Sequence, residues 1–320
     1  MKLYRFALAA LTFSALISTP PSFAEPASAA AVKAQFPGVY RFRLGDFQIT
    51  ALSDGTVPQD LHALLTGTTQ NDVDPLLERS FLKNPVEASI NVYLIDTGSK
   101  LVLVDTGAGQ FFGPGNGGKL LSSLAAAGYK PQQINDILIT HIHTDHSGGL
   151  VKDDHLLFPN ATVHVAKADL DFFLNPANSV SSGYDRSYFD QAAKAIGPYV
   201  RAGKVKTFTG RTQVLPGMTA IPTPGHTPGH SFYLIESHGQ RIEMLGDIAH
   251  VVAVQFTHPE ITIVYDVDQP AAASQRAQQF TTLASERVLV AAPHFPFPGV
   301  GHLRAEAKGY TWVPVEYLNR

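Results

Sequence analysis

The feature that most constrains this chain is the run His141-Ile142-His143-Thr144-Asp145-His146, which places four metal-binding side chains within six positions. The apolar residues 137–140 precede it and Ser147-Gly148-Gly149 follow it, so the motif leaves a short buried strand. In such a loop His141 and His143 point the same way, and the following Asp and His turn toward a second position close by. Imidazole and carboxylate suit zinc or a similar divalent ion. The alternative is a solvated loop, but four ligand types flanked by glycines favour a metal site.

The chain contains no cysteine among its 320 residues. This excludes disulfides, thiolate ligands and a cysteine nucleophile. Any metal must therefore be held by His, Asp and Glu.

Three later motifs offer further ligands. They are Pro224-Gly225-His226-Thr227-Pro228-Gly229-His230, then Leu245-Gly246-Asp247, and then Pro293-His294-Phe295-Pro296. Each is weak alone, because an aspartate at a strand end is usually a turn or cap residue. Their order and their positions beside predicted strands make the combined case for two cations, with Asp247 placed to bridge them.

The remaining pattern predicts an α+β fold. Hairpin-like β segments alternate with helical segments, which favours two sheets between layers of helices. Predicted strands cover residues 40–44, 47–52, 91–95, 100–104, 137–140, 162–165, 205–209, 219–222, 231–236, 241–245, 261–265, 288–291 and 310–315. Predicted helices cover 119–127, 166–174 and 271–284, with another within 175–199.

The N-terminal residues predict export. Lys2 and Arg5 precede an apolar run from Phe6 to Ile17, and Ser22-Phe23-Ala24 is a small-residue cleavage site. We expect a signal peptide over 1–24, a flexible lead-in over 25–36 and a single domain over 37–320, in the periplasm or secreted. The alternative is an uncut helical tether. The run is short for a membrane span, and no later segment predicts one.

Charge excludes one class of partner. The net charge is -3, from 24 basic and 27 acidic side chains, and no basic stripe is present. Nucleic acid is therefore not an expected partner.

The motifs together resemble the metallo-β-lactamase superfamily, whose pattern is HxHxDH followed by a His, an Asp and a final His. Here the intervals are 80, 21 and 47 residues from one motif to the next. The resemblance implies an αββα sandwich with the site at the sheet edge. It also implies that His141, His143 and His226 bind one metal and that Asp145, His146 and His294 bind the other, with Asp247 bridging. It gives Asp105, in Asp105-Thr106-Gly107, the role of orienting a ligand.

A closer resemblance, to methyl parathion hydrolase and its lactonase and arylesterase relatives, extends over most of the chain. It rests on Leu44-Gly45-Asp46-Phe47, on residues 51–56 and 98–107, and on the tail 294–306. It implies that Phe112, Phe173 and one of Tyr188 or Phe189 lie at the pocket mouth, although core packing is the competing interpretation for each aromatic residue. It also suggests a homodimer contact.

The resulting hypothesis is a two-metal hydrolase in which a metal-bridging hydroxide attacks neutral lactones, aryl esters and organophosphate triesters. Asp145 and Asp247 fix the geometry and transiently accept a proton. The cations are expected to be zinc, with manganese, cobalt or iron as alternatives. His250 replaces an aliphatic residue of methyl parathion hydrolase and favours lactones or aryl esters, unless it is merely an exposed histidine. His230 and His302 are expected to support the ligands.

Two alternatives remain open at this stage. One is an N-acyl-homoserine lactonase that interrupts bacterial signalling, which needs room for an acyl chain. The other is a non-catalytic periplasmic metal-binding protein, which has no need of an open position between two cations.

Overall fold

The computed structural model describes residues 35–318 of the chain. Contacts divide the chain into Met1–Phe36 and Pro37–Arg320. The predicted signal peptide over 1–24, and the predicted lead-in as far as residue 34, lie outside the described residues. Within residues 35–318, no helix is both long enough and apolar enough to cross a bilayer.

The first sheet joins an antiparallel meander to a parallel half. Its first two strands are joined by a tight turn at Gly45, which has φ +60°, whereas residues 60–85 separate the second strand from the third. From β5 (Leu101–Val104) onward the neighbours run parallel. Residues of β5 and of the next two strands in the sheet are almost entirely buried, as expected for strands covered on both faces, whereas the edge strand is partly exposed. In spatial order the strands are β1 (Val39–Leu44), β2 (Phe47–Gln59), β4 (Val86–Asp96), β5 (Leu101–Val104), β6 (Asp136–Leu138), β9 (Thr162–Ala166) and β10 (Val205–Phe208).

The second sheet is built mainly from hairpins in the C-terminal half. Only β14 and β16 pair in parallel, and the other neighbours are antiparallel. The order is β11 (Thr212–Leu215), β12 (Met218–Pro222), β13 (Ser231–Ser237), β14 (Gln240–Met244), β16 (Leu289–Ala291), β17 (Val300–Ala305) and β18 (Tyr310–Pro314).

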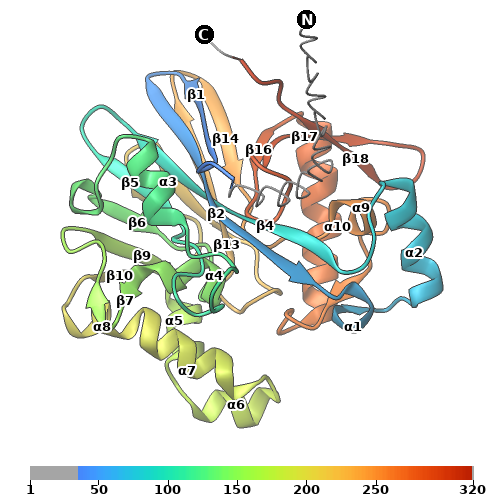
Figure 1. Cartoon of the computed structure of the whole chain (residues 1–320), viewed down its shortest axis with the longest axis horizontal. Coiled ribbons are helices and arrows are strands. Elements are labelled where there is room, and N and C mark those ends of the chain that lie inside the picture. The colour runs from blue at the N-terminus through green and yellow to red at the C-terminus, as the bar shows by residue number, and fades with distance from the viewer. Residues whose placement is uncertain (1–34, 319–320) are drawn as a thin grey trace, which may run out of the picture. The chain divides into compact units, whose positions relative to one another are not determined.

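The two sheets face each other across an apolar core, and helices cover their outer faces (Figure 1). Against the first sheet lie α3 (Leu120–Ala126), α5 (Lys167–Phe173), α7 (Arg186–Ala195) and α8 (Gly197–Arg201). Against the second lies α10 (Gln269–Ser285), whose buried Phe280 and Leu283 join a separate core. The predicted αββα sandwich is confirmed.

Smaller elements lie beside this framework, and one of them, α4 (Thr144–Ser147), carries Asp145 and His146 of the metal-binding motif. They are α1 (Leu61–Leu64), β3 (Leu65–Thr66), α2 (Gln70–Arg79), α4 (Thr144–Ser147), β7 (Val151–Lys152), β8 (His155–Leu156), α6 (Ala177–Ser182), α9 (Val252–Gln255) and β15 (Thr262–Ile263).

Several local predictions were incomplete. The strand expected over 261–265 is only the two residues of β15, because its single partner is the equally short β3. The segment 175–199 forms three short helices rather than one. Helix α2 was missed because Pro75 interrupts its pattern, although Thr69 and Asp72 form a capping box that marks its start. Strand β17 was missed because Gly301 and alternating polar residues weaken its pattern.

The glycine-rich segment 107–118 is held by one buried carboxylate. Asp54 accepts hydrogen bonds from the backbone N–H groups of Ala108 (2.9 Å), Gly118 (2.8 Å) and Leu120 (2.7 Å). A Cβ on Gly107 would lie 2.3 Å from Asp54 Cγ, so only glycine allows this approach. Burial raises the pKa of Asp54 to about 6, while the N–H donors oppose that rise.

We expect Asp54→Asn to lower the free energy of unfolding by about 1–3 kcal/mol at neutral pH. The NH₂ group of asparagine cannot accept a hydrogen bond, so at least one backbone N–H that bonds to the Asp54 carboxylate would lose its acceptor. Denaturant unfolding measures this, with the exposed Asp171→Asn as the matched control. Equal stability of the two variants would contradict the role assigned to Asp54.

Candidate metal centre

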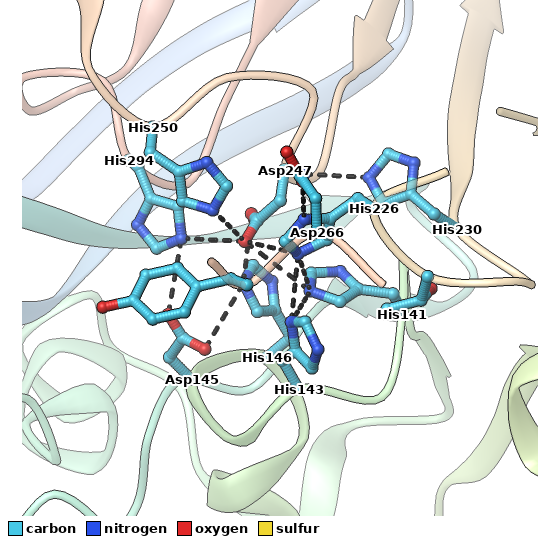
Figure 2. Close-up of polar contacts among 12 residues, drawn as sticks. His141, His143, Asp145, His146, His226, His230, Asp247, His250, Asp266 and His294 are labelled. Carbon is cyan, nitrogen blue, oxygen red and sulfur yellow. Dashed lines mark hydrogen bonds and ion pairs between the residues drawn. The ribbon is translucent and has the colours of Figure 1, made fainter. Parts of the chain in front are cut away.

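The metal-binding motifs meet at one edge because each follows the end of a strand. Residues 141–146 follow β6, Asp105 follows β5 and His226 follows β12. Asp247 follows β14, and His294 follows its parallel neighbour β16. Figure 2 shows the histidines of these motifs and Asp145 converging on Asp247, which lies among the histidines. All seven residues that the resemblance assigned to the two metals lie in this cluster.

The first group has the geometry of a cation site. Nε2 of His141, Nδ1 of His143 and Nε2 of His226 approach one another to 3.0–3.2 Å. Asp247 Oδ2 lies 3.6 Å from the His141 nitrogen and 3.4 Å from that of His226. Four ligands at 2.0–2.1 Å from a tetrahedral zinc ion would stand about 3.4 Å apart. The spacing of these four atoms therefore fits one cation at their centre.

The second group is formed by Asp145, His146 and His294 beside the same Asp247. His294 Nε2 lies 3.3 Å from Asp145 Oδ2 and 3.2 Å from Asp247 Oδ2. His146 Nε2 lies 3.1 Å from Asp247 Oδ1, yet neither atom has a hydrogen-bond partner among the described residues. Buried polar atoms are seldom left without a partner, and a cation would satisfy both. The cluster thus fits a dinuclear metal site.

Burial and mutual charge set the protonation of the cluster. Burial lowers the pKa of His141 and of His143 well below the usual range, which leaves their lone pairs free for a cation. Burial alone would raise the pKa of Asp247, but the surrounding histidines, His146 first, hold it well below its usual range. The carboxylate is therefore ionised and supplies negative charge to both groups.

The outward-facing nitrogens of four ligating histidines have acceptors that fix their orientation. His226 Nδ1 donates to Asp266 Oδ1 (2.7 Å), and His146 Nδ1 donates to Asp105 Oδ2 (2.9 Å). The other two donate to uncharged oxygens: His294 Nδ1 to the Ser89 carbonyl (2.8 Å) and His141 Nδ1 to Thr140 Oγ1 (3.1 Å).

Asp105 supports two parts of the motif at once. Besides His146, it accepts from the backbone N–H of Thr140 (2.8 Å) and from Thr140 Oγ1 (2.9 Å). Its own backbone has φ +60°, a conformation that costs a non-glycine residue energy and is held by the surrounding structure. The carboxylate thus fixes the start of the 141–146 loop.

His230 fixes the backbone of Asp247. Burial lowers the pKa of His230 to about 3, and its neutral Nε2 accepts from the Asp247 N–H at 2.9 Å. A Cβ on Gly246 would lie 2.6 Å from that nitrogen, so the approach requires glycine. His302, in contrast, lies on β17 and donates to the Val288 carbonyl; within residues 35–318 no hydrogen bond or ion pair joins it to the cluster.

Three supporting residues were missed from the sequence. Asp266 holds His226, and the fully buried Arg276 on α10 lies 3.7 Å from Asp266 Oδ2. Asp169 accepts from the Ile142 N–H (2.9 Å) and from Thr227 Oγ1 (2.9 Å), which ties the first motif to the second. Nothing in the local pattern around Asp169, Asp266 or Arg276 distinguishes them from ordinary helix or turn residues.

A cavity of about 510 Å³ opens beside both metal groups. Among the predicted pocket residues, Phe112, Tyr188 and His250 line it. Phe173 and Phe189 do not: they are 1% and 2% exposed and pack in the core, which corrects their assignment. The cavity is also more acidic than expected, because Asp185 joins Asp145 and Asp247 on its wall, and none of the described lining residues is Lys or Arg.

Comparisons with known proteins agree with this geometry. A family model described as the metallo-beta-lactamase superfamily matches residues 86–294. The solved structure of the hydrolase AbOPH, of the beta-lactamase superfamily, has a TM-score of 0.84 at 37% identity, covering 89% of this chain and all of that one. AidC, a dizinc quorum-quenching lactonase solved with the product N-hexanoyl-L-homoserine, has a TM-score of 0.80 at 28% identity, covering 89% and 99%.

Curated relatives are similar over a shorter region. An N-acyl homoserine lactonase of Bacillus cereus is 27% identical over 171 residues, which are 48% of this chain and 60% of that lactonase. The chain therefore matches this relative over less than two thirds of its length.

Proposed function

The chain belongs to the metallo-β-lactamase superfamily, and from this premise we propose that it is a metal-dependent hydrolase that cleaves neutral lactones and aryl esters with two zinc ions. The observation that carries the proposal is the cavity that both metal groups border, with no cationic side chain among its described lining residues. Apart from the metal ions, a site without Lys or Arg offers no positively charged side chain to bind the phosphate of a phosphodiester, and this supports neutral substrates.

The proposed reaction is addition of water to the substrate carbonyl followed by cleavage of the ester C–O bond. When bound, the two cations would supply a water molecule that ionises at neutral pH and positive charge opposite the carbonyl oxygen. Asp145 has a side chain 16% exposed and lines the cavity, so it can accept the proton of the attacking water. Returning that proton to the leaving oxygen completes the hydroxy acid or alcohol product. Asp247, buried among five histidines, keeps the ligands in place.

Two finer substrate classes remain within this proposal. N-acyl homoserine lactones are supported by the named activities of AidC and the Bacillus relatives, and by a cavity within the roughly 300–1,000 Å³ typical of small-molecule sites. Phosphotriesters, the substrates of the methyl parathion hydrolase group, are neutral as well and are proposed as a secondary activity. A non-catalytic metal-binding protein would not need a cavity of this size beside its cations.

A substrate panel tests the proposal. Zinc-loaded protein is assayed with N-hexanoyl and N-decanoyl homoserine lactones, an unsubstituted aromatic lactone, a chromogenic aryl ester and methyl parathion, each with and without chelator. We expect turnover of lactones or aryl esters to exceed that of methyl parathion, and chelator to abolish it. No turnover of any substrate by protein with two bound zinc ions would refute the hydrolase proposal.

His250 bears on the choice among these substrates. Its ring is 1% exposed, stacks on His294 and places Nε2 3.1 Å from Asp247 Oδ2. We expect His250→Leu to lower lactone turnover by about tenfold, which is the effect of losing one hydrogen bond to a charged group. The same substitution should lower methyl parathion turnover less. The ratio of the two rates measures this, with His258→Leu, outside the cluster, as the control. An unchanged ratio would remove His250 from substrate selection.

Export and dimerisation remain separate proposals. The signal-peptide pattern over 1–24 predicts that the mature protein begins near Glu25 in the periplasm or outside the cell. N-terminal sequencing of the exported protein tests the cleavage site, and its mass in solution tests dimerisation.

A further inference from the structure

One ligating histidine, His143, is oriented by a tyrosine from another part of the chain. The hydroxyl oxygen of Tyr184 lies 3.0 Å from His143 Nε2 and 2.8 Å from the carbonyl oxygen of Tyr265. The Tyr184 ring lies nearly parallel to the His143 imidazole, at 15° and 6.0 Å between centroids. Tyr184 is thus in contact with a ligand of the first metal group and with a wall of the cavity at the same time.

The direction of these hydrogen bonds follows from what each atom can do. A carbonyl only accepts, so the single hydroxyl hydrogen of Tyr184 points to Tyr265. The Tyr184 oxygen must then accept from His143, which places a proton on Nε2. In a neutral imidazole the other nitrogen then carries a lone pair. That nitrogen, Nδ1, is the atom that faces His141 and His226 at 3.1 and 3.0 Å.

The surroundings of Tyr184 show that it is the anchor of its segment. From Val180 to Ser187 every residue except Tyr184 is exposed, and helix α6 just before it has no buried residue. Gly183, with φ +70°, turns the chain so that the next side chain points inward. This same segment carries Asp185 and Ser187, which line the cavity together with Tyr188 and Tyr265.

We propose that Tyr184 is a positioning residue of the first metal site: its hydroxyl holds His143 with Nδ1 directed at the cation, and it joins that ligand to the 180–188 wall of the cavity. This inference rests on one part of the proposed function, the binding of the first cation, and does not depend on the identity of the substrate. Outer partners of metal-binding histidines typically contribute about 10- to 100-fold to metal affinity.

Zinc affinity measured by competition with a chromogenic chelator tests this without any substrate. Tyr184→Phe keeps the ring and removes the hydroxyl. We expect it to weaken the binding of one of the two zinc ions by about 10-fold or more and to leave the affinity for the other unchanged. Tyr199→Phe is the matched control, because the Tyr199 hydroxyl also bonds to backbone groups, those of Phe158, but is remote from the ligands. It should lower thermal stability without changing zinc affinity.

A double-mutant cycle with His143→Ala identifies the route of the effect. If Tyr184 acts through His143, then Tyr184→Phe added to His143→Ala causes no further loss of zinc affinity. An equal loss in both backgrounds, or unchanged zinc binding by the single Tyr184→Phe variant, would overturn the proposal. Inactivity toward the whole substrate panel would instead bear on the proposed function, because the zinc measurement would still stand.

Discussion

Replacing Asp247 with alanine is expected to release both cations and to abolish hydrolysis in one step. The Asp247 carboxylate lies 3.1–3.6 Å from ring nitrogens of five histidines, His141, His146, His226, His250 and His294. It is 2% exposed, so its removal leaves buried cations and histidines without their shared negative partner. The loss of activity should exceed the about 10- to 100-fold that outer partners of a ligand cost. Metal analysis and lactone turnover measure the two effects together.

Two further variants make this result specific. Asp247→Asn keeps the size of the side chain and one oxygen but removes the charge, and we expect it to bind fewer than two zinc ions per chain. Asp46→Ala removes an exposed carboxylate that pairs with His238, and it should bind two zinc ions and remain active. Retention of two cations by Asp247→Ala would contradict the bridging position of this residue.

Removing the metal from the intact protein is expected to have the second largest effect. Without cations, the ring nitrogens of His141, His143 and His226 are held only by contacts with one another at 3.0–3.2 Å. The buried His146 Nε2 and Asp247 Oδ1 then have no hydrogen-bond partner among the described residues. A ligand present at a thousand times its dissociation constant stabilises the folded state by about 4 kcal/mol, and two ions are bound. We therefore expect chelation to lower the melting temperature by more than about 10 °C, as well as to abolish activity.

The choice of ion provides the control for chelation. Zinc should restore both stability and activity, because imidazole dominates the cluster, whereas magnesium should restore neither, since it prefers oxygen ligands in an octahedral arrangement. Protons compete with metal for histidine, so release by chelator should be faster at about pH 5 than at about pH 7. Unchanged melting of metal-free protein would show that the cations do not stabilise the fold.

Asp54 and Tyr184 each hold a segment of the chain that lines the cavity. Asp54 fixes the loop that carries Phe112, and Tyr184 fixes the segment that carries Tyr188. Each of these two segments is held by one polar side chain, the buried Asp54 in the first case and the partly buried Tyr184 in the second. We therefore expect substitution of Asp54 or Tyr184 to change the shape of the cavity more than substitution of the aromatic residues on its surface.

The sequence by itself determined the fold class and the residues of the metal cluster. Each ligand lies within a few residues of the end of a buried strand, as 141–146 does after β6 and Asp247 after β14, and strand ends gather at one sheet edge. Both the apolar strand and the ligand types after it are local signals, so a linear pattern carries them.

Only the tertiary structure decided what surrounds the ligands. Asp266 holds His226 across 40 positions, and Tyr184 holds His143 across 41, and each is a common residue type in an unremarkable local pattern. Packing likewise placed Phe173 and Phe189 in the core while their neighbour Tyr188 lines the cavity. Hydrogen-bond partners and pocket walls depend on which distant segments meet, and that is fixed by the packing of helices against the sheets rather than by any spacing along the chain.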